Sequence, residues 1–183
     1  MSGQCGLLVM DVQPGIVDRL ANKEDYLQNM TSLISRTKEN KIPVIYVVVG
    51  FRPGMPEISQ SNISFSSLKK EARDTIINPR PALELEDLDI VVTKKRVSAF
   101  AGSDLEVVLR ALDIQEIVLT GIATSGVVLS TLRQAADMDY KIRVLSDLCA
   151  DFDDEVHNVL INKVFPRQAI VESSDQWIKG LGA

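Results

Sequence analysis

Short apolar runs alternate with segments of helical periodicity along most of this chain, and no other feature restricts the fold so strongly. We interpret five runs as β-strands, at residues 6–10, 44–49, 90–92, 117–119 and 142–145, and a sixth at 169–171. The first three are apolar throughout, which is typical of strands covered on both faces. Regular alternation of strand and helix predicts an α/β fold: a doubly wound, Rossmann-like, mostly parallel sheet of about six strands with helices on both faces.

Four helical stripes are expected between these strands. The second helix is predicted to begin at Ser103, because Glu106 three positions later completes a capping box; the third follows Gly121 and the fourth begins near Asp153. Their inward residues are Tyr26, Leu27, Met30, Leu33 and Ile34 in the first, Leu105, Val108, Leu109 and Leu112 in the second, Val128, Leu132, Ala135 and Ala136 in the third, and Val156, Val159, Leu160 and Val164 in the fourth.

The length of 183 residues predicts a single domain over residues 1–183. One segment, 51–89, breaks the alternation: it is long, polar and rich in Ser, Pro and Asn, with a short helix expected around 67–72. A connection of that length is usually functional or disordered.

Charge and composition exclude several classes of protein. The net charge of -5, with both signs interspersed, argues against a nucleic-acid partner. No apolar stretch approaches the length of a membrane span and no export signal opens the chain, so we expect a cytoplasmic protein. Cys5 and Cys149 lie far apart without CxxC spacing, and the simplest interpretation is two reduced, buried thiols.

In a doubly wound sheet the ligand crevice lies beyond the carboxyl ends of the strands, so residues directly after each apolar run are the site candidates. Asp11 follows the first run, where burial and a nearby cation tune a carboxyl for proton transfer; an acid that caps a turn explains it equally well. Lys94, Lys95 and Arg96 follow the third run. A lysine there either pairs with Asp11, binds a substrate carboxylate, or is simply solvated.

The fourth run leads into a small-residue turn, Gly121 to Val127, before a helix. Free backbone amides at a helix start form an anion site or an oxyanion hole, although a tight turn needs small residues for steric reasons alone. Ser125 and Ser130 are poor candidates for a nucleophile, since no GxSxG elbow is present. His157, the only histidine, is expected to be a packing or surface residue.

Three segments in order resemble the isochorismatase-like hydrolase family of the cysteine hydrolase superfamily: LLVMDVQ at 7–13, KKRVSAF at 94–100 and GIATSGVVLST at 121–131. The resemblance runs over nearly the whole chain. It implies that Asp11, Lys94 and Val127 occupy the positions of the family's aspartate, lysine and nucleophilic cysteine. It also implies a non-proline cis peptide at Ile122-Ala123 and an oxyanion hole made by the amides of Ala123 and Val127.

Val127 is the departure from the family pattern that matters most, because an isopropyl group cannot attack an amide carbon. The metal-binding Asp-x-His of the nicotinamidase branch is also missing at 49–54, so neither metal nor cofactor is expected. True isochorismatases resemble this chain in lacking the cysteine. They cleave a vinyl ether by protonating the enol-ether carbon from the aspartic acid.

Two functions follow from these observations. The first is a noncovalent hydrolase of a small molecule (a vinyl ether, an amide or a related bond) with Asp11 as general acid/base and Lys94 as its partner. The alternative is a catalytically disarmed protein that binds a small ligand or regulates a partner. Contacts to the substrate are expected from Gln13, Phe51, Arg52, Phe100 and Thr124, although a surface role explains Arg52 equally well. The resemblance implies a homo-oligomer, either a dimer or a tetramer.

Overall fold

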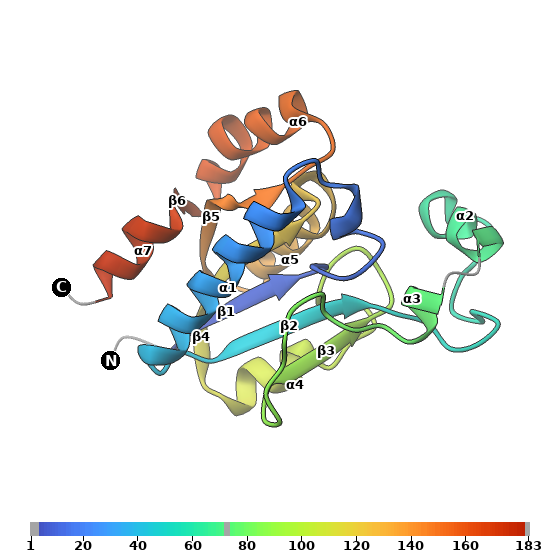
Figure 1. The fold of residues 1–183 in the computed structure, drawn as a ribbon, viewed down its shortest axis with the longest axis horizontal. Helices are drawn as coiled ribbons and strands as arrows, with labels where there is room; N and C mark the ends of the chain where they lie inside the picture. The colour runs from blue at the N-terminus through green and yellow to red at the C-terminus, as the bar shows by residue number, and fades with distance from the viewer. Residues whose placement is uncertain (1–3, 72–73, 182–183) are drawn as a thin grey trace.

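A single six-stranded sheet forms the centre of the computed structural model, which describes residues 4–71 and 74–181 (Figure 1). Its strand order is β3-β2-β1-β4-β5-β6, and every neighbouring pair is parallel. The strands are β1 (Gln4–Met10), β2 (Val44–Val49), β3 (Ile90–Lys94), β4 (Ile114–Ile122), β5 (Lys141–Ala150) and β6 (Ile170–Glu172). This order confirms the predicted doubly wound α/β fold and reverses direction between β1 and β4, where such sheets open a crevice.

Helices cover both faces of the sheet, as predicted. They are α1 (Lys23–Glu39), α2 (Ile63–Glu71), α3 (Asp74–Ile77), α4 (Leu105–Ala111), α5 (Leu129–Asp137), α6 (Asp154–Val159) and α7 (Ser174–Gly180), with short 3-10 or π segments η1 (Val17–Arg19), η2 (Thr124–Val128), η3 (Leu160–Val164) and η4 (Phe165–Arg167). One hydrophobic core packs α4, α5 and η3 on the sheet, and a second packs α1 and α7 on the opposite face.

Alternation along β1 shows how one strand serves both cores. Leu8 and Met10 belong to the core beneath α4 and α5, whereas Leu7 and Val9 belong to the core beneath α1. β2 is likewise buried along its whole length. The expectation that β3 is covered on both faces is wrong: it is the edge strand of the sheet, and Val91 is 40% exposed.

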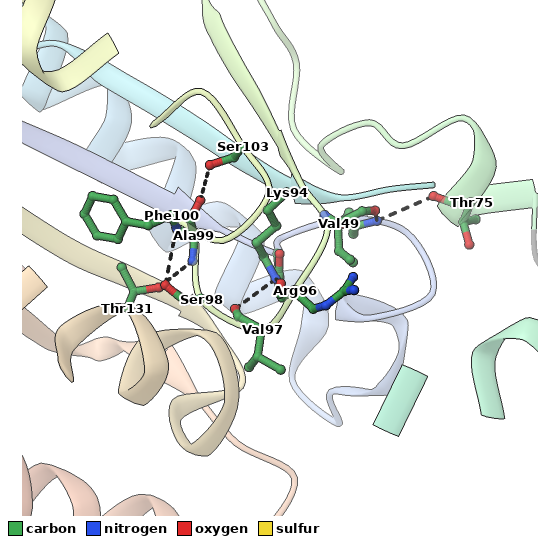
Figure 2. Close-up of polar contacts among 12 residues, drawn as sticks. Val49, Thr75, Lys94, Arg96, Val97, Ser98, Ala99, Phe100, Ser103 and Thr131 are labelled. Atoms are coloured by element: carbon green, nitrogen blue, oxygen red, sulfur yellow. Dashed lines mark hydrogen bonds and ion pairs between the residues drawn. The ribbon is translucent and has the colours of Figure 1, made fainter. Parts of the chain in front are cut away.

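The capping box predicted at Ser103 is not formed. α4 begins at Leu105, and Asp104 precedes it without a capping side-chain bond. The Ser103 hydroxyl donates instead to the carbonyl of Ala99 at 2.6 Å (Figure 2) and accepts the amide of Leu105 at 3.3 Å. A capping box does occur where sequence analysis expected no helix: Ser173 and Gln176 bond reciprocally at the start of α7.

The fourth predicted helix begins where expected but buries fewer residues. Asp153 caps α6 by accepting the amides of Glu155 and Val156. Leu160 is buried as predicted, but Val156 and Val159 are 38% and 41% exposed, so their inward assignment is wrong. Only the later part of the helical segment, η3, lies on the sheet core.

Residues 51–71 and 74–77 form a partly separate unit beside the carboxyl end of β2, where Figure 1 shows α2 and α3 away from the main sheet, whereas Ala82 and Leu83 pack in the core under α1. The short helix predicted around 67–72 is α2, which begins earlier; residue 72 lies outside the described residues. A third small core, which includes Phe51, Met55, Phe65 and Ile76, holds this unit together. The unit therefore packs against the carboxyl end of β2 through this small core.

None of the helices in the described ranges has the length and apolar character needed to cross a membrane.

Candidate functional site

The backbone itself marks Asp11 as unusual. Asp11 directly follows β1 and has a φ of 56°, in the left-handed region that few side chains adopt. Its amide donates to the carbonyl of Val47 at 2.8 Å, so β2 fixes the position of the residue, and the side chain is buried. Sparsely populated backbone conformations cluster at functional sites.

Lys94, the last residue of β3, is 2% exposed and reaches the same point. Its ammonium lies 2.9 Å from Asp11 Oδ2, so the predicted pairing of the two side chains is present. It also donates to the carbonyls of Arg96 at 3.0 Å and Val97 at 3.1 Å (Figure 2). An ammonium has three N–H donors, and all three have acceptors within the protein. Lys94 therefore has no donor left for a substrate carboxylate.

The two carboxylate oxygens of Asp11 differ. Oδ2 pairs with Lys94, whereas Oδ1 is buried and has no hydrogen-bond partner among the described residues. Burial raises the pKa of the Asp11 carboxyl, and the charge and hydrogen bond of Lys94 lower it by less, so the pKa stands above its ordinary value. The site thus offers one oxygen that accepts or carries a proton.

The loop after Lys94 is tied to α5. Ser98 donates to Gln134 Oε1 at 2.7 Å, and the amide of Ala99 donates to Thr131 Oγ1 at 3.0 Å (Figure 2). These bonds join the end of β3 to the helix that follows the fourth strand. The two parts of the predicted site are therefore held in one rigid frame.

We call residues 121–128 the site turn. Gly121 has a φ of 138°, and a Cβ there would lie 2.1 Å from the carbonyl oxygen of Met10, so the turn packs directly against the residue that precedes Asp11. The Ile122-Ala123 peptide is cis, at the position that the resemblance implies. The π segment η2 follows, and within it Val127 is 2% exposed, as part of the core under α5.

Two side chains from beyond β5 brace the site turn. Asp151 Oδ2 accepts the amide of Ser125 at 2.6 Å, and His157 Nδ1 shares a hydrogen bond of 2.8 Å with Thr124 Oγ1. Sequence analysis missed Asp151 altogether and expected only packing or surface exposure for His157. The predicted run ended at residue 145, whereas β5 continues to Ala150, so the strand-end rule did not point to Asp151.

The predicted substrate contacts have other partners in this structure. The Gln13 side chain is fully buried and bonds both backbone groups of Val49, its amide donating to the carbonyl at 3.2 Å and its oxygen accepting the N–H at 2.8 Å. Thr124 is fully buried against His157. The polar atoms of both side chains are therefore engaged within the protein.

The remaining three lie in apolar or exposed surroundings. Phe51 is 3% exposed and packs edge-to-face on Phe65, and Phe100 lies against Tyr140. Arg52 is exposed and pairs with Glu57 at 2.6 Å. Their contact with a substrate stays a prediction.

Neither cysteine has the character of a nucleophile. Cys149 lies within β5, beside Gly121 of β4, and not in the turn that follows the strand. Burial raises the pKa of the Cys149 thiol far above its ordinary value, and burial with the charge of Glu116 raises the pKa of Cys5 to about 12. Cys5 is only half-buried, although both thiols were expected to be buried. A thiol that stays protonated is a poor nucleophile.

No group of three or more potential metal ligands gathers anywhere in residues 4–71 and 74–181.

Comparison with known proteins covers nearly the whole chain. Residues 5–176 match the family model described as the isochorismatase domain. The isochorismatase family protein YecD of Escherichia coli O157:H7 is 30% identical over 178 residues, which is 96% of this chain and 95% of the relative. A ureidoacrylate amidohydrolase, RutB of Variovorax paradoxus, is 49% identical over 59 residues, 32% of this chain and 23% of its own.

Solved structures agree with the sequence comparison. An isochorismatase family protein from Burkholderia thailandensis superposes with a TM-score of 0.83 at 29% identity, covering 98% of this chain and 96% of that one. The shared sheet and the family match over most of the length lead to one conclusion. This chain is a member of the isochorismatase family.

Proposed function

We propose that this protein is a noncovalent hydrolase of a small molecule, in which Asp11 is the general acid and base. One observation carries the proposal: a buried carboxyl has one oxygen fixed by Lys94 and the other, Oδ1, without a partner among the described residues. A buried polar atom without a partner is costly unless something satisfies it in the working state. A substrate or a water at Oδ1 would do so.

The surroundings of Asp11 suit proton donation. Because its pKa is raised, the carboxyl keeps its proton to higher pH than a free aspartic acid, and a catalytic acid works best with a pKa near the operating pH. Lys94 limits that rise and orients the group through Oδ2. Lys94 is therefore a positioning residue, since its own donors are occupied.

For a vinyl ether the steps balance without a nucleophilic side chain. Asp11 Oδ1–H protonates the enol-ether carbon, water adds to the oxocarbenium carbon that results, and the hemiketal releases the alcohol. The proton lost by the attacking water restores the acid. One general acid contributes about 10²- to 10⁴-fold, so orientation of the substrate by the site turn supplies the rest.

Amide hydrolysis through a thioester is a poorer proposal for this chain. The name of the RutB relative describes an amidohydrolase, but the position that the resemblance gives to the nucleophile is Val127 here. The two thiols present have raised pKa values. We therefore propose vinyl ethers as the most favoured class of substrate, followed by amides and carbamoyl compounds that water attacks directly.

The proposal is tested by Asp11→Asn after a hydrolase screen of these three substrate classes. Turnover of the best substrate should fall by about 10²-fold or more, because Asn cannot transfer the proton. Asp139→Asn is the matched control: Asp139 also has a left-handed φ, of 64°, but lies outside the site, so turnover should not change. Full turnover by Asp11→Asn would refute the proposal.

The second candidate is a catalytically disarmed protein that binds a small ligand. It is favoured by Val127, because a hydrocarbon side chain stands at the position of the nucleophile, and both Val127 and Lys94 are only 2% exposed. Val127→Cys separates the two functions. If the wild type hydrolyses nothing in the screen and Val127→Cys gains amidase activity, the scaffold is a disarmed cysteine hydrolase. Val128→Cys, in the same turn and fully buried, should gain none.

A further inference from the structure

A cavity outside the Asp11 site lies at the end of β5, the strand that borders β4 on the side opposite β1. It has a volume of about 440 Å³, within the range of small-molecule sites, and neither Asp11, Lys94 nor Val127 lines it. Its walls come from residues 19–22, between η1 and α1, from the end of β5, and from α6. Leu20, Cys149 and Ala150 provide its apolar lining.

Three side chains bring nitrogen atoms that can form hydrogen bonds to this cavity. The Arg19 guanidinium lies over the Phe152 ring, 3.7 Å from its centroid, and it has no carboxylate partner among the described residues. Asn22 forms no side-chain hydrogen bond within that same part of the chain. His157 uses Nδ1 for Thr124, so Nε2 stays available.

Two carboxylates line the same space. Asp151 is occupied, since its oxygens accept the amides of Ser125 and Phe152. Asp154 is exposed and has no ion pair or side-chain hydrogen bond within the described residues. A simple anion would therefore meet Arg19 but be repelled by Asp151 and Asp154, and a simple cation would meet Arg19 as a like charge.

We propose that this cavity binds a small zwitterion of the amino-acid type, with its carboxylate on Arg19 and its ammonium on Asp154. Only a molecule with both charges satisfies both of these side chains. An apolar stem of a few methylene groups would then cover Leu20 and Ala150. Asp151 and His157 also form hydrogen bonds to the site turn, so only these two side chains would separate the bound molecule from that turn.

The chain carries its own reporters for a test by NMR. His157 is the only histidine and lines the cavity, whereas Trp177 is the only tryptophan, a buried residue of α7 outside the cavity lining. The full-length protein is titrated with glycine, β-alanine and 4-aminobutyrate, which differ only in stem length, and separately with acetate and methylamine. At least one zwitterion should shift the His157 ring signals in a saturable way, without moving the Trp177 indole signal.

Two charge-removing variants complete the test. Arg19→Gln and Asp154→Asn should each lower the affinity for the zwitterion by about tenfold or more, as expected for loss of a charged hydrogen bond. Arg110→Gln and Glu106→Gln remove a comparable exposed pair from α4 and should leave the titration unchanged.

The proposal is overturned if none of the three zwitterions shifts the His157 ring signals. It is also overturned if acetate alone binds as tightly as the zwitterions do and Asp154→Asn does not lower the affinity for them. This test is independent of the proposed hydrolase function. Asp11→Asn should bind the zwitterion as the wild type does, even where turnover is lost.

Discussion

The two sides of the site turn are built in opposite ways. On one side, Asp11 and Lys94 are almost fully buried, and every ammonium donor of Lys94 is used within the protein. On the other, Arg19 and Asp154 line an open cavity without partners of opposite charge among the described residues. A buried, fixed pair sets a protonation state, whereas exposed charges are free to recognise a ligand. The comparison predicts that stability depends strongly on the first side and weakly on the second.

The largest effect is expected from Lys94→Met. This change leaves a buried carboxyl without its cation, and breaking a buried pair costs about 3–5 kcal/mol in the free energy of unfolding. Urea unfolding at neutral pH measures it. The adjacent Lys95→Met is the control: Lys95 is half-buried and donates to the carbonyl of Gly50, so its loss should cost about 1 kcal/mol. Equal losses would contradict the comparison.

A pH dependence should follow from the same pair. The pKa of Asp11 is raised in the folded state, so the folded protein retains this proton where the unfolded chain has released it. Its contribution to stability is therefore fully present below the ordinary aspartate pKa of 3.8 and is lost as pH rises through the folded pKa, by at most about 1.4 kcal/mol per pH unit.

Removal of Lys94 sharpens that dependence. Lys94 lowers the pKa of Asp11, so in Lys94→Met the loss of stability should extend to higher pH than in the wild type. The double variant Asp11→Asn, Lys94→Met should lack the extended slope. Unfolding free energies measured from acid to neutral pH would show it, and identical slopes in all three proteins would argue against a buried Asp11.

An intermediate effect is expected at the site turn itself. Gly121→Ala places a Cβ against the Met10 carbonyl oxygen, and the φ of this position is unfavourable for alanine. The free energy of unfolding should therefore fall by about 1–3 kcal/mol. Gly126→Ala, in the same turn, would place its Cβ 3.7 Å from that of Ala123, an ordinary contact. Thermal unfolding should separate the two variants, and a harmless Gly121→Ala would show that the turn does not pack against β1 as described.

The smallest effect is expected on the cavity side. Arg19→Gln loses only an exposed cation–π contact with Phe152, worth about 0.5–1 kcal/mol. The same urea measurement is used. If Arg19→Gln lowered the free energy of unfolding as much as Lys94→Met does, Arg19 would be a stabilising residue. The contrast between the two sides would then be wrong.

Periodicity was enough to predict the sheet, because each strand is a short apolar run and each connection has a helical stripe. Features that depend on tertiary neighbours could not be predicted. Ser103 was expected to cap α4, but its hydroxyl donates to Ala99. Val91 was expected to be buried, but strand order places β3 at the edge. Neither the partner of a hydroxyl nor the order of strands is written in local sequence.

The site was predicted in part, for a similar reason. Asp11 and Lys94 follow apolar runs, so the rule that ligands bind at strand ends located both. Asp151 and His157 meet the site turn from 26 and 33 positions away, and nothing in their own segments indicates this contact. Gln13 was expected to face a substrate, but its amide joins the loop after β1 to β2.

The acid character of Asp11 is the central claim, and its titration tests that claim directly. The carboxyl carbon signal of Asp11, assigned by comparison with Asp11→Asn, is followed by NMR across the pH range in the wild type and in Lys94→Met. The midpoint should lie above the ordinary aspartate pKa in the wild type and move higher in Lys94→Met. A wild-type midpoint at or below that ordinary value would contradict the role of Asp11 as the proton donor.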